Sequence, residues 1–403
     1  MINLPFITKS SKEENNRFLV VNINSDFVRC LVLYKENGAI KILGAGKQEM
    51  DPGKVRAGSI IYPDYVAQAL ESAATKALEE VGGGEISDMI LGVSGDLCLG
   101  LMTTVKAKRN RSLPITGKEI EELTEKINDS AYLQAQNEYM QINGGAENEL
   151  ETVTSSNVYT KLDNQKVSAL ENKTGALIEM ATFNAFVPTH HLRSLQKVAD
   201  EADLKILAIG SEMYCLVQNM LAANVGETDF IVVEIDGDYT TVAVVFGRGI
   251  VATRTLNVGY KHFVEGVSER MGLTTHEADR VVKSYVQGKL TSTEITVVQN
   301  ALRNTLEIWL SGMELLFAEY SGVKTFPPKM YFTGEGADVA DLWDLLTSDE
   351  WTKSIPFKTK PEFKKLSFMD INGVSDVTGK ITSSEWIPTA SLAIIKLEMD
   401  RDA

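Results

Sequence analysis

The segments Phe18–Tyr34 (FLVVNINSDFVRCLVLY) and Phe230–Phe246 (FIVVEIDGDYTTVAVVF) are two versions of one pattern and align without a gap. Each copy has an apolar run, a polar turn and a second apolar run, which is typical of a β-hairpin. A third strand-like run follows each copy, at Ala39–Gly44 and at Ile250–Leu256. The residues of the first copy that are identical to their counterparts in the second copy are Phe18, Val20, Val21, Ile23, Asp26 and Val32. The repeat predicts two similar halves whose hairpin tips converge on one cleft.

Size and composition indicate a globular protein with more than one core. The 403 residues are enough for two to four domains or subdomains. Hydrophobic residues make up 44% and charged residues 24%, which is ordinary for globular proteins. The net charge of −15 argues against nucleic acid and against a broad anionic membrane surface, because both attract basic patches. Three cysteines without pair spacing indicate reduced thiols and a cytoplasmic protein.

The N-terminal residues 1–16 are predicted to form a flexible leader. They have a short apolar start and no cationic region, unlike a signal peptide. No apolar stretch of the chain approaches the roughly 18 residues that a transmembrane helix needs. The alternative is that the apolar residues of the leader dock on a partner or a membrane; these are Ile2, Leu4, Pro5, Phe6 and Ile7.

Polar residues at the two hairpin tips predict a phosphate-binding site. Unpaired N–H groups at such a tip form a positive concavity, and a carboxylate ending the first strand can hold hydrated Mg²⁺. A Gly-rich loop, Thr333–Ala337 (TGEGA), joins a predicted strand to a helix and would complete a nucleoside cradle. The alternatives are an ordinary strand–helix turn for Gly334 and Gly336 and a solvated acidic turn for Glu234, Asp236 and Asp238.

Several motifs, in order along the chain, resemble those of the FtsA family of actin-like ATPases. Asn22–Ser25 stands where that family has Asp-Ile-Gly-Thr or Ser, and Glu234–Thr240 where it has Asp-Ile-Gly-Gly-Gly-Thr-Thr. Thr333–Ala337 is similar to its adenosine motif, Thr-Gly-Gly-Gly-Ala. Further matches are Gly92–Gly95, Asn257–Gly259 and Pro388–Ala390. The resemblance runs from about Phe18 to Leu397.

The resemblance implies an α/β protein with the actin-like fold, in which duplicated RNase H-like halves surround a nucleotide cleft. It implies a first-half core at 17–86, completed by 204–226 and 385–403, and an SHS2-type insertion at 87–203. The second half would be 227–384, with its own insertion near 260–325. Within the first insertion the pattern predicts a helix over Ile115–Ile127 and an irregular polar stretch over Gln134–Ser156. A closing helix is expected over Ile387–Met399.

The resemblance also implies ATP and Mg²⁺ as cofactors. Glu212 stands at the family's water-orienting position, and Glu234 and Asp236 would be the Mg²⁺ ligands. Asp279 and Lys283 only approximate the family's ribose-facing pair. The residues that would bind the nucleotide are Asn22, Asn24, Ser25, Glu234, Gly237, Thr240, Asp279, Lys283, Gly334, Glu335 and Gly336.

Departures from the family motifs weaken the nucleotide site. Asn22 replaces the first-tip Asp and is a poor acceptor for a magnesium-bound water. Asp236 and Asp238 replace glycines, and a carboxylate about 5 Å from a phosphate costs about 3 kcal/mol at an effective dielectric near 20. Tyr239 replaces a small residue near the γ-phosphate position. We therefore hypothesise that hydrolysis is lost or very slow, while nucleotide binding stays open.

Three functional hypotheses follow from the resemblance. The first is a cytoplasmic scaffold at the inner face of the membrane that self-assembles and recruits an FtsZ-like division filament. The second is an active ATPase whose polymerisation is gated by nucleotide. The third is a platform protein like PilM of type IV pilus machines, which binds the tail of a membrane protein. The acidic residues 397–403 do not resemble FtsA's basic amphipathic C-terminal helix. Either part of the native tail is missing from this sequence, or membrane contact is indirect or through the leader.

Overall fold

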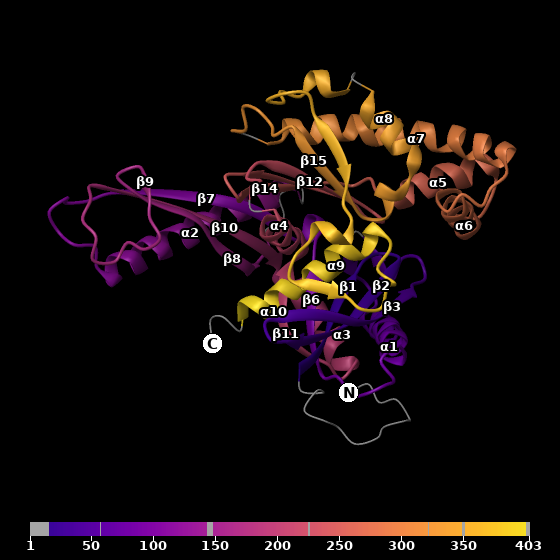
Figure 1. Cartoon of the computed structure of the whole chain (residues 1–403), viewed down its shortest axis with the longest axis horizontal. Helices are drawn as coiled ribbons and strands as arrows, with labels where there is room; N and C mark the ends of the chain where they lie inside the picture. The colour runs from indigo at the N-terminus through magenta and orange to yellow at the C-terminus, as the bar shows by residue number, and fades with distance from the viewer. Residues whose placement is uncertain are drawn as a thin grey trace.

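The computed structural model describes residues 16–56, 58–142, 148–224, 226–320, 322–348 and 351–399. Two large β-sheets organise these residues: a six-stranded sheet in the first half, and a nine-stranded sheet that begins in the second half (Figure 1). The apolar leader residues lie outside the described residues. No helix in the described part of the chain combines the length and hydropathy that crossing a membrane requires.

The two predicted hairpins have the same register. They are β1 (Arg17–Ile23) with β2 (Phe27–Glu36), and β12 (Phe230–Ile235) with β13 (Thr240–Phe246). Ile23 pairs with Val28, and Ile235 pairs with Thr240, so both partners shift by the same 212 positions (235 − 23 and 240 − 28). Both tips are closed by the same turn, in which the N–H of Asn24 or Asp236 donates to the carbonyl three residues later at 3.0 Å. The structure therefore confirms the predicted duplication.

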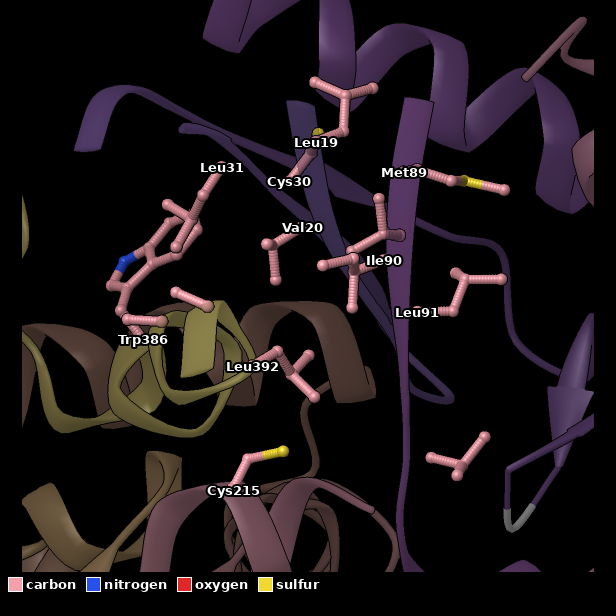
Figure 2. Packing of buried hydrophobic residues seen from close by; sticks show 14 of the residues in the cluster. Leu19, Val20, Cys30, Leu31, Met89, Ile90, Leu91, Cys215, Trp386 and Leu392 are labelled. Carbon is pink, nitrogen blue, oxygen red and sulfur yellow. The ribbon is translucent and has the colours of Figure 1, made fainter. Parts of the chain in front are cut away.

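The first-half sheet has the strand order β11-β6-β1-β2-β3-β17 and helices on both faces. Its side chains alternate between two apolar layers. Figure 2 shows Val20 and Ile90 pointing toward Leu392 of the C-terminal segment, while Leu19 points the opposite way. The other strands and helices are β3 (Ala39–Glu49), β6 (Asp88–Val93), β11 (Lys205–Ser211), β17 (Val374–Asp376), α1 (Pro63–Glu79), α3 (Thr189–Glu201), α4 (Glu212–Ala223), α9 (Ile387–Ser391) and α10 (Ala393–Met399).

Two features of this half refine the sequence prediction. The closing helix expected over Ile387–Met399 is two short helices, α9 and α10, separated at Leu392. All three cysteines of the chain are buried and free, as the composition predicted. A small hairpin of β4 (Val55–Arg56) and β5 (Ser59–Ile60) precedes α1.

The second half repeats the three-stranded unit and adds helices around a separate core. Fully buried Phe263, Trp309 and Phe332 lie in this core. Its remaining strands and helices are β14 (Gly249–Leu256), β15 (Lys329–Thr333), β16 (Glu362–Lys365), α5 (Tyr260–Met271), α6 (Thr275–Val286), α7 (Ser292–Ala318) and α8 (Ala340–Thr347).

The inserted unit is narrower than the predicted 87–203. Strand β6 pairs in parallel with both β1 and β11, and α3 packs against α1, so both elements belong with the first-half sheet. The part that leaves this sheet consists of β7 (Leu99–Lys108), α2 (Gly117–Ile142), β8 (Leu150–Leu162), β9 (Gln165–Lys166) and β10 (Leu177–Pro188).

Helix α2 is much longer than the predicted Ile115–Ile127 and runs into the stretch expected to be irregular. Ala131, Ala135 and Tyr139 recur at i, i+4 and i+8 and are buried against β7 and β10, which extends the helix despite its polar outer face. The predicted irregular stretch Gln134–Ser156 is therefore wrong at both ends: its first part belongs to α2, and its last part belongs to β8.

The inserted unit extends the sheet of the second half, although the chain enters it from the first half. Strand β14 pairs with β7 through Ala252 and Leu101, and the N–H of Gly100 donates to Thr253 Oγ1 at 2.8 Å. Figure 1 shows β7 continuing the direction of the β12–β14 sheet. The insertion therefore joins the two halves away from the hairpin tips.

Candidate functional site

The two hairpin tips contact each other directly. Asn24 Nδ2 donates to Asp236 Oδ1 at 3.0 Å, and these two residues occupy equivalent positions in the duplicated hairpins. Ser25 Oγ donates to Asp238 Oδ2. The Nζ of Lys261 lies 3.3 Å from Asp238 and bridges toward the first tip. Protein side chains thus occupy the position between the tips where the sequence predicted phosphates.

Two amides of the first tip already have an acceptor within the turn. The N–H groups of Asp26 and Phe27 donate to Asn24 Oδ1 at 3.1 and 2.7 Å, so the side chain of Asn24 fills the concavity of its own turn. At the second tip, a Cβ added to Gly237 would lie 2.8 Å from Asp26 Oδ2. Glycine at 237 therefore permits close approach of the first tip, rather than of a ligand.

Tyr239 forms a third contact between the halves. Its hydroxyl lies 2.6 Å from Ser94 Oγ, and its ring is 3% exposed. Gly95 has a φ of +65°, and a Cβ there would lie 2.9 Å from the ring of Tyr239. The Tyr239 side chain, which the sequence analysis expected near the γ-phosphate position, is therefore packed against the first half.

A buried arginine forms the centre of an ionic cluster, which we define as Arg29, Lys47, Asp236, Glu335 and Glu385. Arg29 lies beside Asn22 and Lys47 on adjacent strands of one sheet. Two neighbouring cations repel unless anions lie between them. Arg29 pairs with Glu335 at 3.0 Å and Glu385 at 3.1 Å, and Lys47 contacts the same two carboxylates.

These contacts favour the charged forms of Arg29 and Glu335. Burial lowers the pKa of Arg29. The carboxylates of Glu335, Glu385 and Asp236 raise it by a larger amount, so the net shift of the pKa is upward. Burial raises the pKa of Glu335, but Lys47 and Arg29 outweigh it and hold that pKa well below its usual range. The cluster joins strands β2 and β3 of the first half to the Gly-rich loop after β15.

A carboxyl cluster formed by Glu212, Glu234 and Asp236 adjoins the ionic cluster and shares Asp236 with it. Glu212 Oε1 accepts a hydrogen bond from Asn22 Nδ2 at 2.5 Å. The other carboxylate oxygen of Glu212 and one oxygen of Glu234 are buried and have no hydrogen-bond partner among the described residues.

Burial and the nearby Asp236 raise the pKa of Glu212 to about 7, although the hydrogen bond from Asn22 and the charge of Arg29 oppose the shift. Burial, Glu212 and Asp236 raise the pKa of Glu234 well above its usual value. The raised pKa values favour the protonated forms of Glu212 and Glu234, which reduces the repulsion between these buried carboxyl groups. The catalytic role predicted for Glu212 stays a prediction.

Three predicted ligand residues have other roles in the structure. Thr240 does not face the cleft: its hydroxyl donates to the Val258 carbonyl at 2.7 Å and accepts from Trp309 Nε1 at 2.8 Å. A Cβ at Gly334 or Gly336 would lie 2.4 or 2.2 Å from atoms of Ile235, so the glycines allow the loop to pack on β12. The Thr240 hydroxyl is thus bonded within the core, and a contact of Thr240 with a ligand stays a prediction.

Asp279 and Lys283 lie at the edge of the cleft and pair with each other at 2.5 Å. Lys283, Tyr260, Glu335 and Glu385 line a cavity of about 440 Å³ beside the Gly-rich loop, which we call the loop cavity. No group of three or more His, Cys, Asp or Glu side chains is arranged to hold a metal ion within the described ranges. Magnesium binding by Glu234 and Asp236 stays a prediction.

The sequence prediction missed the cations of the site. Arg29 interrupts the otherwise apolar run Phe27–Leu33, and a charge at such a position requires a buried partner. That signal could have indicated a buried ion pair, but it could not have identified the partners. Glu385 is 356 residues away in the chain.

No protein-family model and no curated protein matches the sequence. Among solved structures, the chain is similar to a "PilM-PilN type IV pilus biogenesis complex" structure, with 14% identity, a TM-score of 0.67, and coverage of 94% of this chain and 98% of the other. It is also similar to MreB5 of Spiroplasma citri bound to ADP, with 10% identity, a TM-score of 0.50, and coverage of 96% and 98%. These similarities confirm the duplicated actin-like ATPase fold. They do not single out the FtsA family.

Proposed function

We propose that this protein is an actin-fold assembly scaffold whose closed state is held by its own side chains rather than by a nucleotide. The observation that carries the proposal is the direct contact between the tips, Asn24 with Asp236 and Ser25 with Asp238. In this view the protein acts by binding partners and copies of itself, and nucleotide turnover is not part of its function.

The charges at the tips do not fit a magnesium nucleotide. The seven carboxyl groups around the tips outnumber the three cations Arg29, Lys47 and Lys261. Phosphates would add negative charge, and the neutral Asn22 removes a carboxylate that could hold magnesium water. We therefore derive no catalytic step through ATP. The seven carboxyl groups are Asp26, Glu212, Glu234, Asp236, Asp238, Glu335 and Glu385.

Between the possible cellular roles, the similarity to PilM supports a pilus-type platform at the cytoplasmic face of the membrane. The alignment covers nearly all of both chains, including the inserted unit. In such a role the partner would be the tail of a membrane protein. A division scaffold that recruits an FtsZ-like filament is the second candidate, and it rests on the sequence motifs alone.

Calorimetry and a phosphate-release assay test the nucleotide part of the proposal. We expect no saturable heat from Mg-ATP or Mg-ADP at micromolar concentrations and no turnover above the buffer blank. The matched variant Asp236→Gly/Asp238→Gly removes the two carboxylates at the second tip, so any residual affinity should rise in it. Turnover by the wild type that Glu212→Ala abolishes would contradict the proposal.

Partner identity requires a separate experiment. The tagged full-length chain would be purified from its own cells and its companions identified by mass spectrometry. Recovery of a pilus membrane protein supports the platform role, and recovery of an FtsZ-type protein supports the division role. Recovery of neither class, from cells shown to express both, would refute both roles.

A further inference from the structure

A second, larger cavity of about 550 Å³ lies between the two halves, and we call it the β3–α6 cavity. One wall comes from the end of β3 and the start of α1, and the other from α5 and the start of α6. Tyr260 and Glu335 separate it from the loop cavity, since both residues line both spaces. The volume is in the range of sites for small organic ligands, which often form at domain interfaces.

The walls of the β3–α6 cavity combine apolar surface with negative charge. Phe27, Tyr65 and Tyr260 contribute aromatic rings, and Met50 and Val264 contribute aliphatic surface.

Five carboxyl groups line the same space, together with Lys261 and with His276, whose Nδ1 lies 3.6 Å from Glu49; the five are Asp26, Glu49, Asp51, Asp279 and Glu335. Lys283 already neutralises Asp279, and Lys47 and Arg29 neutralise Glu335. Asp51 has no cationic partner among the described residues, and it lies exposed at the rim. The excess charge therefore favours a cation and disfavours an anion.

The protein's own lysines show that these aromatic rings accept ammonium groups. Lys54 Nζ lies 4.7 Å from the ring of Tyr62 and 4.8 Å from that of Tyr65. Lys47 Nζ lies 3.7 Å from the ring of Phe27. Ammonium groups bind aromatic faces at such distances, most strongly where water is excluded.

We propose that the β3–α6 cavity binds an organic polycation of the polyamine class. Its ammonium groups would pair with the carboxylates of the rim, and its methylene chain would lie on the aromatic and aliphatic wall. A bare metal ion does not match this wall, because it gains nothing from apolar surface. Since the ligand would touch both halves, its binding would stabilise the closed arrangement.

Asp26 supplies a second signature of such binding. The pKa of Asp26 is raised to about 6. Burial is the main cause, Lys261 opposes the shift, and the carboxylates of Asp238, Glu335 and Asp236 contribute to it. A bound cation favours the ionised carboxylate, so binding near pH 6 should release a proton, and affinity should fall at lower pH.

Titration calorimetry with spermidine at constant ionic strength tests the proposal. We expect saturable, submillimolar binding to the wild type, and a heat at pH 6 that depends on the ionisation enthalpy of the buffer. Asp51→Asn should weaken binding several-fold, and Thr275→Trp, at the exposed rim on α6, should block it. Glu121→Gln and Thr296→Trp, both on exposed helix faces elsewhere, are the charge and bulk controls and should bind like the wild type.

Three results would overturn the proposal: absence of saturable binding by spermidine, equal effects of Na⁺ or Mg²⁺ at matched ionic strength, or unchanged affinity in both rim variants. Mg-ADP titrated in the same series tests the nucleotide-free scaffold separately. Binding of Mg-ADP would contradict the scaffold proposal, whereas failure of spermidine would contradict only the cavity proposal.

Discussion

Arg29 connects the two halves of the molecule through buried ion pairs. It is 2% exposed and is surrounded by carboxylates from the second half and the C-terminal segment. A buried ion pair contributes little net stability compared with an apolar pair, but removal of one partner leaves an uncompensated buried charge. Removal of Arg29 should therefore lower the unfolding free energy strongly, and the loss should arise at the contact between the halves.

We predict that Arg29→Met destabilises the protein by about 3–5 kcal/mol, because Glu335 and Glu385 lose a buried cation. Urea unfolding followed by circular dichroism measures this. Lys41→Met is the matched control, since Lys41 pairs with Glu36 on the exposed part of the neighbouring strand and should change stability little. A loss below 1 kcal/mol for Arg29→Met would show that the ionic cluster does not hold the halves together.

The carboxyl cluster predicts an unusual pH dependence. The pKa of Glu212 is about 7 in the folded protein and about 4.5 in the unfolded chain. Folding therefore favours the protonated form, and this contribution is complete below about pH 4.5 and is lost as the pH rises through about 7. The pKa of Glu335 is shifted downward, so its contribution is already present across this window.

Unfolding free energies measured from pH 5 to pH 8 test this directly. Between pH 5 and pH 8, the unfolding free energy of the wild type should fall by up to about 3 kcal/mol more than that of Glu212→Gln. This follows from the upward shift of the Glu212 pKa, since one pKa unit corresponds to 1.36 kcal/mol. Glutamine keeps the shape of the side chain and removes the titration. Parallel profiles for the two proteins would mean that Glu212 stays ionised in the folded state.

At the scale of elements, the inserted unit is tied to both halves. Its chain leaves and re-enters the first half, while β7 pairs with β14 of the second half. Arg254 of β14 also pairs with Glu138 of α2 at 3.1 Å. Opening of the cleft therefore has to strain or break this junction, and the insertion limits how far the halves can move apart.

Thr253→Val should weaken this junction, because the buried N–H of Gly100 loses its acceptor. We expect a loss of about 1–3 kcal/mol, which is the cost of an unsatisfied buried donor. Hydrogen exchange should accelerate at residues 99–101 and 252–254. Thr104→Val, at an exposed site on β7, the strand that contains Gly100, is the control. Unchanged exchange at the junction would argue that β7 and β14 are held together by other contacts.

At the scale of the whole molecule, the proposed function requires that internal contacts, rather than a nucleotide, set the closed conformation. The hydrogen bonds between the tips and the ionic cluster share Asp236, whereas the β7–β14 junction lies at a separate place along the contact between the halves. Links at both places favour one closed state over an ensemble of open ones. A scaffold of this kind should present the same surface to its partners whether or not ATP is present.

We therefore predict that any assembly of the purified protein is independent of nucleotide. Sedimentation and negative-stain electron microscopy would compare samples with no nucleotide, with Mg-ATP and with Mg-ADP, and the polymer fraction should agree within error. Asp236→Gly/Asp238→Gly, in which the contacts between the tips are lost, is the informative variant. Filaments that form only with Mg-ATP in the wild type would favour a nucleotide-gated ATPase.

The sequence by itself determined the duplicated hairpins, their register and the actin-like fold. Apolar runs and turn residues report local structure, and the repeat Phe18–Tyr34 and Phe230–Phe246 made the two halves visible. The tertiary structure alone decided the charge partners of Arg29, the core position of Thr240 and the borders of the insertion. The physical reason is that a buried charge, a core hydroxyl and an edge strand are each satisfied by groups distant in the chain, and local periodicity carries no record of them.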